Sequence, residues 1–168
     1  TVSVDNGAAL TVSSQTAERT YRSAGGEAAV DVTLSVAPGG RLDWVPQETI
    51  LFDRSRIARK LTLALSGTAE ALVSEAVVLG RAAMGETMVT GFFSDDWRIT
   101  RAKPGAEDTL EACRAILPQS DGLCIGATAK NGVLIVRMIA MSGQILRAAL
   151  TSVLTHIRAA PMPRVWQL

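Results

Sequence analysis

An alternation of apolar and polar residues runs through much of the first hundred residues, and it constrains the fold more than any other feature. In the segment 28–37, AAVDVTLSVA, the apolar residues at every second position share one face: Val30, Val32, Leu34 and Val36. The segment 56–66, RIARKLTLALS, repeats the pattern with Leu61, Leu63 and Leu65. A period of two places successive side chains on opposite faces of a β-strand, and no helical period competes with it here. The sequence therefore predicts a mainly β fold.

Three strand–turn–strand units follow one another along this region. SVDNGAALTVSSQ at Ser3–Gln15 is similar to SVAPGGRLDWVPQ at Ser35–Gln47, and LALSGTAEALVSE at Leu63–Glu75 follows the same outline more loosely. Repeated units of this kind stack on one another, either as layers or as a short helical winding. We expect layered antiparallel strands over residues 1–102, including a strand pair within residues 88–100.

The remaining residues, 103–168, differ in character. GAEDTLEACRAIL at 105–117 has apolar residues at helical spacing and acidic residues in its first turn, which predicts a helix. Asn131-Gly132 separates two apolar runs and is a strong signal for a tight β-hairpin. Ser142 can cap a second helix, and Pro161 follows the end of that helix. The sequence thus predicts an α+β part, helix–hairpin–helix with an extended tail, that completes one compact domain with residues 1–102.

Composition argues against several classes of function. Seventeen basic and sixteen acidic residues give a net charge of +1 without a block of one sign, so we expect no nucleic-acid binding. No apolar run approaches the roughly 20 residues that cross a bilayer, so we expect no membrane span. The phosphate-binding GxxxxGK[ST] and nucleophile GxSxG motifs are absent, and the single histidine is His156. Two cysteines without a CxxC pair favour a reducing, cytoplasmic location.

Four carboxylates remain as candidates for chemistry because they lie within or beside apolar strands: Glu48, Asp53, Glu75 and Glu86. A buried carboxylate is costly unless a cation or hydrogen-bond donors accompany it. These side chains can accept arginine or backbone hydrogen bonds at strand breaks, line a polar passage or interface, or form an acid–base pair for glycoside cleavage. Aromatic residues make up only 4% of the chain, which argues against a sugar-binding cleft.

Three stretches occur in a specific order, and the chain then ends in PRVWQL: RTYRS at 19–23, WVPQETILFD at 44–53 and LGRAAMGE at 79–86. With this set, most of the chain resembles the urease accessory protein D family, also called H. The resemblance implies a mostly β, non-enzymatic scaffold that joins a helical accessory protein, F, to a GTPase, G. It also implies that this complex, in which a homodimer is one option, docks on apo-urease and inserts nickel. No tightly bound cofactor is expected.

The resemblance also points to residues that contact partners or line an ion passage: Tyr21, Arg22, Ser23, Gln47, Glu48, Asp53, Glu75, Arg81 and Glu86. Pro46 breaks the strand pattern, so we expect the chain to turn there and to bring oxygen-bearing side chains into one polar seam: Ser23, Gln47, Glu48, Glu75 and Glu86. Oxygen ligands hold Ni²⁺ less tightly than imidazole or thiolate, which makes Glu75 and Glu86 weak candidates for transient contact with nickel. Arg22 and Arg81 are the expected partners of these carboxylates.

The sequence departs from the family in two places, and it leaves two other functions open. Family members carry a further N-terminal segment and a segment near Ala102–Lys103, and nothing in this sequence matches either. An enzyme with paired carboxylates, acting on a small molecule, would lose turnover when Glu48 and Glu75 are replaced. A β-rich interaction module unrelated to metal would leave urease unaffected when it is deleted.

Overall fold

The computed structural model describes residues 1–102, 113–116, 122–130, 133–158 and 160–167. The chain forms two compact units, residues 1–104 and residues 105–167. The first unit is built from strands, and the second combines a sheet with a helix. The mainly β fold with a C-terminal helical part, predicted from the sequence, is confirmed.

In the first unit the chain winds through three successive coils of three strands each. The first coil contains β1 (Val2–Val4), β2 (Ala9–Val12) and β3 (Glu18–Thr20). The second contains β4 (Ala28–Val36), β5 (Arg41–Trp44) and β6 (Thr49–Leu51), and the third contains β7 (Arg56–Ser66), β8 (Glu70–Val73) and β9 (Val77–Leu79). β10 (Phe92–Ala102) begins a fourth coil.

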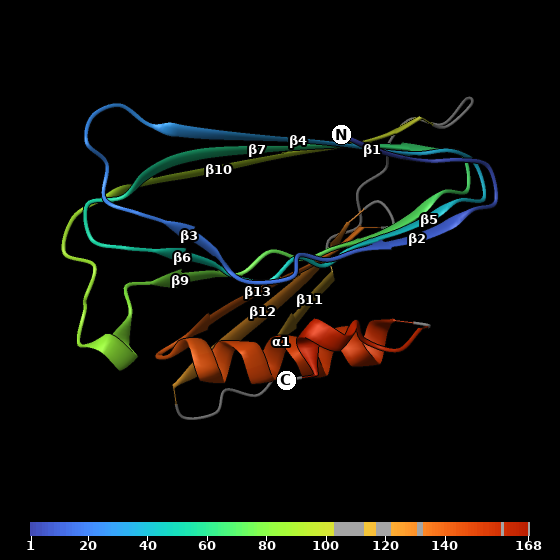
Figure 1. Cartoon of the computed structure of the whole chain (residues 1–168). Helices are drawn as coiled ribbons and strands as arrows, with labels where there is room; N and C mark the ends of the chain where they lie inside the picture. The colour runs from blue at the N-terminus through green and yellow to red at the C-terminus, as the bar shows by residue number, and fades with distance from the viewer. Residues whose placement is uncertain (103–112, 117–121, 131–132, 159, 168) are drawn as a thin grey trace. The chain divides into compact units, whose positions relative to one another are not determined.

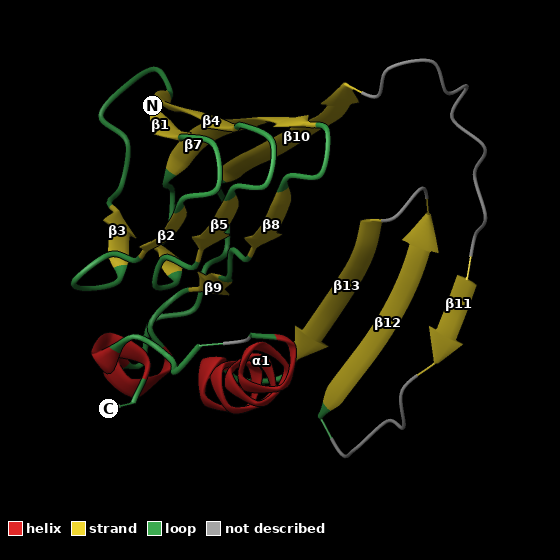
Figure 2. Ribbon diagram, turned by 90° about the vertical axis from the view of Figure 1, so that its right-hand side faces the viewer, coloured by secondary structure: helices red, strands yellow, loops and turns green. Residues whose placement is uncertain are grey.

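Equivalent strands of successive coils lie side by side (Figure 2). They form three parallel sheets with the orders β1-β4-β7-β10, β2-β5-β8 and β3-β6-β9. The first sheet makes one wall of the winding, and the other two make the opposite wall (Figure 1). This arrangement is a short parallel β-helix.

The parallel pairing corrects the prediction of antiparallel layers. Val2 pairs with Leu34 and Leu34 pairs with Leu63, so the chain returns to the same position after 32 and then 29 residues. A period of two predicts strands but says nothing about their direction, whereas a repeat at this spacing is typical of a winding. Ser3 and Ser35, equivalent positions in the sequence repeat, are paired neighbours in the sheet. The helical winding is therefore the correct one of the two arrangements that the repeat allowed.

Residues 88–100 do not form the predicted strand pair. A single strand, β10, runs in unbroken parallel register beside β7. Its sequence contains neither Gly nor Pro, so nothing divides it. The 3₁₀ helix η1 (Ala82–Met84) and a loop connect β9 to β10.

The alternation seen in the sequence places leucine and valine side chains inside the winding. Leu34 of β4 and Leu63 of β7 are paired neighbours, and both are buried. With Leu42 of β5 they belong to one cluster of buried apolar residues. Burial of each such side chain contributes roughly 1.5–3 kcal/mol. Because the inward face of each coil is largely apolar, stacking the coils produces a continuous core.

Glycine shapes the corner between the first and second strands of each coil. Gly7, Gly39 and Gly67 have φ values of 67°, 70° and 55°, in the left-handed region that other residues rarely adopt. Gly7 N donates a hydrogen bond to the Pro38 carbonyl at 3.2 Å, which ties the first corner to the second. The turn chemistry therefore repeats from coil to coil.

The second unit contains an antiparallel sheet of β11 (Cys113–Ile116), β12 (Leu123–Lys130) and β13 (Val133–Ala140). The β12–β13 pairing agrees with the predicted hairpin, whose turn residues Asn131-Gly132 lie outside the described residues. The helix predicted at 105–117 is wrong at Cys113–Ile116, which is a strand, and the rest of that prediction lies outside the described residues. Pairing with β12 overrides a short run of apolar residues at helical spacing.

The helix α1 (Gly143–Ile157) begins where the sequence predicts. Ser142 Oγ accepts a hydrogen bond from Ile145 N at 3.2 Å and caps the helix. Farther along, the 3₁₀ helix η2 (Arg164–Trp166) buries Trp166, whose ring centre lies 5.0 Å from the Arg147 guanidinium of α1. Among the described residues, no helix has the length and hydropathy needed to cross a bilayer.

Candidate functional site

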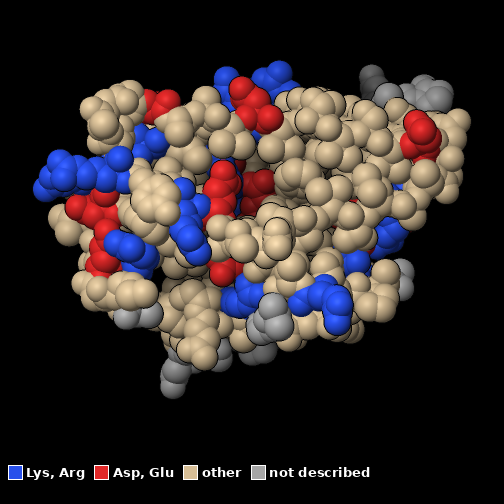
Figure 3. Space-filling view, viewed as in Figure 1, with Lys and Arg blue, Asp and Glu red and all other residues tan. Residues whose placement is uncertain are grey.

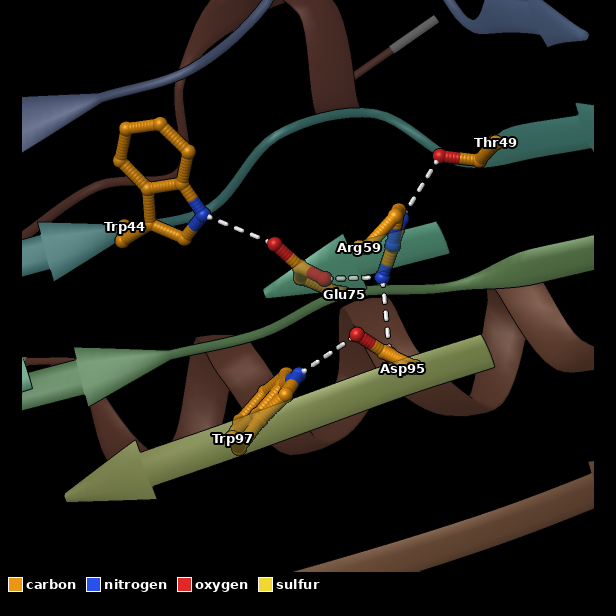
Figure 4. A network of polar contacts seen from close by, with 6 residues as sticks. All are labelled: Trp44, Thr49, Arg59, Glu75, Asp95 and Trp97. Carbon is orange, nitrogen blue, oxygen red and sulfur yellow. Dashed lines mark hydrogen bonds and ion pairs between the residues drawn. The ribbon is translucent and has the colours of Figure 1, made fainter. Parts of the chain in front are cut away.

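A charged side chain occupies the interior of the winding. Arg59 lies on β7 between Ile57 and Leu61, at a position that the alternation directs inward, and its side chain is 8% exposed. Two carboxylates, Glu75 and Asp95, form ion pairs with its Nη2 atom (Figure 4). An arginine can occupy this inward position because these groups neutralise it and accept its hydrogen bonds.

The contacts around Arg59 link three coils. Thr49 of β6, in the second coil, accepts a hydrogen bond from Arg59 Nη1 at 3.0 Å. Glu75, at the corner between β8 and β9, accepts a hydrogen bond from Trp44 Nε1 at 3.3 Å. Asp95 comes from β10 and lies 2.9 Å from Arg59 Nη2. We call Trp44, Thr49, Arg59, Glu75 and Asp95 the interior cluster.

The interior cluster contains more acidic than basic groups. Burial raises the pKa of Glu75 above its ordinary value of 4.5, and the Arg59 cation opposes that shift without cancelling it. The negative charge of Asp95 adds to the increase. One guanidinium faces two carboxylates, so the cluster favours a proton or another cation beside Glu75.

A second group of candidate residues lies at the corner that follows β3, β6 and β9. Tyr21 packs edge-on against Phe52, with ring centroids 4.9 Å apart. The Arg81 guanidinium lies 4.0 Å from the centroid of the Phe52 ring and forms an ion pair with Glu86. The hydrogen bond to Glu86 raises the pKa of Arg81, which keeps the guanidinium cationic. We call Tyr21, Phe52, Arg81 and Glu86 the corner cluster.

Exposed apolar side chains accompany the corner cluster. Tyr21 is 63% exposed, and Leu79 at the end of β9 is 67% exposed. The loop between β9 and β10 exposes Met84 and Val89 by 78% and 80%. Large apolar side chains exposed together mark contact surfaces more often than scattered ones do.

Asp53 and Ser23 stabilise turns in the first unit. Asp53 accepts hydrogen bonds from Val89 N at 2.8 Å and Thr90 N at 2.9 Å. The bond from Thr90, followed by the bond from Val89, lowers the pKa of Asp53 below its ordinary value of 3.8. Ser23 Oγ donates a hydrogen bond to the Gly26 carbonyl at 2.9 Å and lines a shallow surface depression.

Gln47 and Glu48 lie at the corner between β5 and β6, after the break at Pro46. Gln47 is buried, and its backbone N–H donates to Ser14 Oγ at 2.8 Å. Glu48 is half-buried, and its backbone carbonyl accepts from Glu18 N at 3.0 Å. These bonds hold the corner of the second coil on the corner of the first.

Charges of both signs are mixed on the surface. Lys and Arg lie next to Asp and Glu on the face shown in Figure 3, without a large patch of one sign. Arg41 pairs with Glu70 at 3.0 Å, and Arg56 pairs with Glu27 at 2.7 Å. Such mixed charges among the described residues differ from the basic stripe typical of a nucleic-acid-binding surface.

Comparison with known proteins decides the family. The sequence model of the UreD urease accessory protein family matches residues 1–106 and 102–167. The chain belongs to the UreD family. Urease accessory protein UreD 2 of Methylorubrum populi is 39% identical over 204 residues, which cover 99% of this chain and 69% of the relative.

Two further relatives show similar coverage. The urease accessory protein UreD of Azorhizobium caulinodans is 34% identical over 204 residues, covering 99% of this chain and 75% of the relative. That of Xanthobacter autotrophicus is 39% identical over 198 residues, covering 95% of this chain and 68% of the relative. The resemblance found in the sequence is confirmed.

Relatives carry a segment that this UreD family member lacks. The alignment with the M. populi protein runs over 204 residues and the chain has 168, so that relative has at least 36 residues without a counterpart here. The two family matches meet at residues 102–106, directly after β10. The two family matches thus divide at the point where the fourth coil would continue.

The candidate residues of this UreD family member do not form one seam, and that prediction is wrong. Glu75 belongs to the interior cluster and Glu86 to the corner cluster, because each lies at a different corner of the winding. Arg81 pairs with Glu86 as predicted, but Glu75 pairs with Arg59. Within the part of the chain that the structure describes, no group of three or more His, Cys, Asp and Glu side chains could hold a metal ion.

Arg59 and Asp95 were not predicted as site residues, although the sequence contains a signal for both. Each occupies an inward position of an alternating strand, and the register pairs the two residues directly. A charged residue at such a position requires a buried partner. Arg22, a predicted partner, is exposed and forms an isolated β-bridge with Ser55.

Replacing Arg59 tests the interior cluster. We expect Arg59→Met to lower the free energy of unfolding by about 3 kcal/mol, because it leaves two carboxylates without their shared cation. Adding Glu75→Gln should recover part of this loss. The matched control is Arg56→Met on the same strand, whose exposed pair with Glu27 contributes less than about 1 kcal/mol. Urea unfolding measures each variant, and equal losses for Arg59→Met and Arg56→Met would contradict this account.

Asp53→Asn tests the turn at residues 89–90 through its pH dependence. A carboxylate with a lowered pKa stabilises the folded state above its unfolded pKa, and that contribution is lost as the pH falls through the folded pKa. The variant should be less stable than the parent near neutral pH, and the two should converge as the pH drops below 3.8. Thermal unfolding at a series of pH values measures the difference. A difference that stays constant would show that the ionised carboxylate is not its cause.

Proposed function

We propose that this chain is a scaffold in urease maturation. It joins the helical accessory protein F and the GTPase G and docks on apo-urease, where the complex inserts nickel. Nucleotide hydrolysis is the task of the GTPase, and the chain itself catalyses no reaction. The observation that carries the proposal is the match to a urease accessory family over nearly the whole chain. We place the assembly in the cytoplasm, because two cysteines without a CxxC pair favour a reducing compartment.

The exposed apolar side chains beside the corner cluster support a docking role. Tyr21, Met84 and Val89 are each more than 60% exposed. Aromatic residues and methionine are enriched in the centres of protein interfaces. Arg81 and Glu86 offer a guanidinium and a carboxylate beside this apolar area, which can orient a partner. We therefore propose that this corner contacts an accessory protein.

Nickel is the cargo of the assembly in this proposal, and Glu75 and Glu86 contact it in transit. Each of these carboxylates holds an arginine, so nickel would replace a guanidinium. Burial raises the pKa of Glu75, and a carboxylate that gains from a proton also gains from a metal cation. Carboxylate oxygen binds Ni²⁺ weakly enough for the ion to leave again.

Glu75→Gln and Glu86→Gln, alone and combined, test the transit role. In cells that express urease and all accessory proteins, we expect normal assembly with F and G and a lower nickel content of purified urease. Glu70→Gln is the control, because Glu70 is an exposed carboxylate that pairs with Arg41 on the outside. Affinity capture measures assembly, and mass spectrometry of the purified enzyme measures nickel. Loss of assembly with either single variant, or full nickel loading with the double variant, would rule out this role.

A further inference from the structure

β10 starts a coil that the described residues of the first unit do not complete. It is the last strand of its sheet, whereas each of the two opposite sheets ends one strand earlier, at β8 and β9. The inward residues of β10 share the register of buried residues on β7. Three of them are nevertheless 36–38% exposed: Phe93, Trp97 and Ile99. The open end of the winding thus presents an apolar face that a further layer of strand would cover.

The free edge of β10 has few of the features that prevent strands from pairing. Exposed edges are usually short, bulged or interrupted by proline, or they direct an unpaired charge inward. β10 has 11 residues in unbroken register. Its inward charges are already satisfied within the unit, Asp95 by Arg59 and Arg101 by the carbonyls of Gly67 and Ala69. Among the described residues no strand pairs with this edge, so it can accept a strand from outside.

One hydrogen bond shows which backbone groups of β10 point to its free edge. Phe92 N donates to the Ser55 carbonyl beside β7 at 2.9 Å. Because backbone groups alternate in direction along a strand, the even-numbered amides of β10 point to β7. The odd-numbered amides, from Phe93 to Arg101, point to the free edge. A partner strand must pair with these odd-numbered residues.

We propose that β10 pairs antiparallel with β10 of a second copy of this chain, with Trp97 opposite Trp97. This register pairs all 11 residues, from Phe92 opposite Ala102 to Ala102 opposite Phe92. It places odd-numbered residues opposite odd-numbered residues, as the free edge requires. It also places Asp96 opposite Arg98 twice, once on each side of the symmetry axis, and opposite charges in facing positions stabilise a sheet.

Neighbouring registers would make the pair of β10 strands less stable. A shift of the partner strand by two residues keeps the odd-numbered amides aligned, but it places either Asp96 opposite Asp96 or Arg98 opposite Arg98. Like charges in facing positions destabilise a strand pair. Full overlap and charge complementarity therefore select the same register. The pairing gathers the exposed inward side chains of both copies, Phe93, Trp97 and Ile99, into one apolar layer.

This self-association requires neither accessory proteins nor urease. The M. populi relative has at least 36 residues without a counterpart in this chain, and the two family matches divide directly after β10, where a further coil would lie on this edge. This chain lacks those residues, so the second copy supplies the missing layer. The inference does not depend on the proposed function, since it concerns the isolated chain.

Substitutions that reverse the facing charges of the two β10 strands test the proposal. Sedimentation equilibrium of the full chain should show a monomer–dimer equilibrium. Asp96→Arg places two arginines opposite each other on both sides of the axis, so the dimer dissociation constant should rise by about tenfold or more. Asp96→Arg combined with Arg98→Asp restores opposite charges and should restore the dimer.

Asp31→Arg is the matched control. Asp31 on β4 and Asp96 on β10 are the register neighbours of Lys60 on β7, one on each side, so both substitutions place an arginine beside the same lysine. Asp31 is separated from the free edge of β10 by β7 and β10, and its replacement should leave the dissociation constant unchanged. Circular dichroism verifies that each variant is folded.

Hydrogen exchange gives a second measurement. The odd-numbered amides of β10 should exchange more slowly as the parent protein is concentrated, and this protection should be lost in Asp96→Arg. A chain that stays monomeric, a dimer that Asp96→Arg leaves intact, or a double variant that does not recover the dimer would overturn the proposal.

Discussion

The return of the chain to the same register in each coil is the constraint on which the rest of the structure depends. In a parallel ladder Leu34 lies beside Leu63, so an inward residue in one coil has an inward neighbour in the next. A slip of one residue would turn each core side chain outward and each exposed side chain inward. The repeated corners with Gly7, Gly39 and Gly67 keep the turns equivalent and so protect this register.

The interior cluster is the main exception to the apolar interior of the winding. Arg59 takes an inward position on a strand whose other inward residues are Ile57, Leu61, Leu63 and Leu65. Its partners come from the second coil, the third coil and β10, so the charge is compensated only when the coils are stacked. Natural proteins place such departures where function or specificity requires them. The cluster therefore links the stacking of the coils to the proposed path of a cation.

The sequence predicted the strands, their inward faces and the α1 cap, because these depend on neighbours along the chain. It did not predict strand direction from alternation, since Leu34 has the same pattern in a parallel or an antiparallel sheet. The Arg81–Glu86 pair was predictable because only a short turn with Gly85 in the left-handed region separates the two residues. Arg59, Glu75 and Asp95 lie far apart in the sequence and meet only in the folded winding, so their cluster required the structure.

Membership of the UreD family assigns this chain to urease maturation in our account. The most direct measurement is the nickel content of urease purified from a strain that lacks the gene for this chain, with and without the gene restored on a plasmid. The account predicts urease protein in normal amount but poor in nickel, with nickel recovered on complementation. Urease that is fully loaded with nickel in the deletion strain would contradict it.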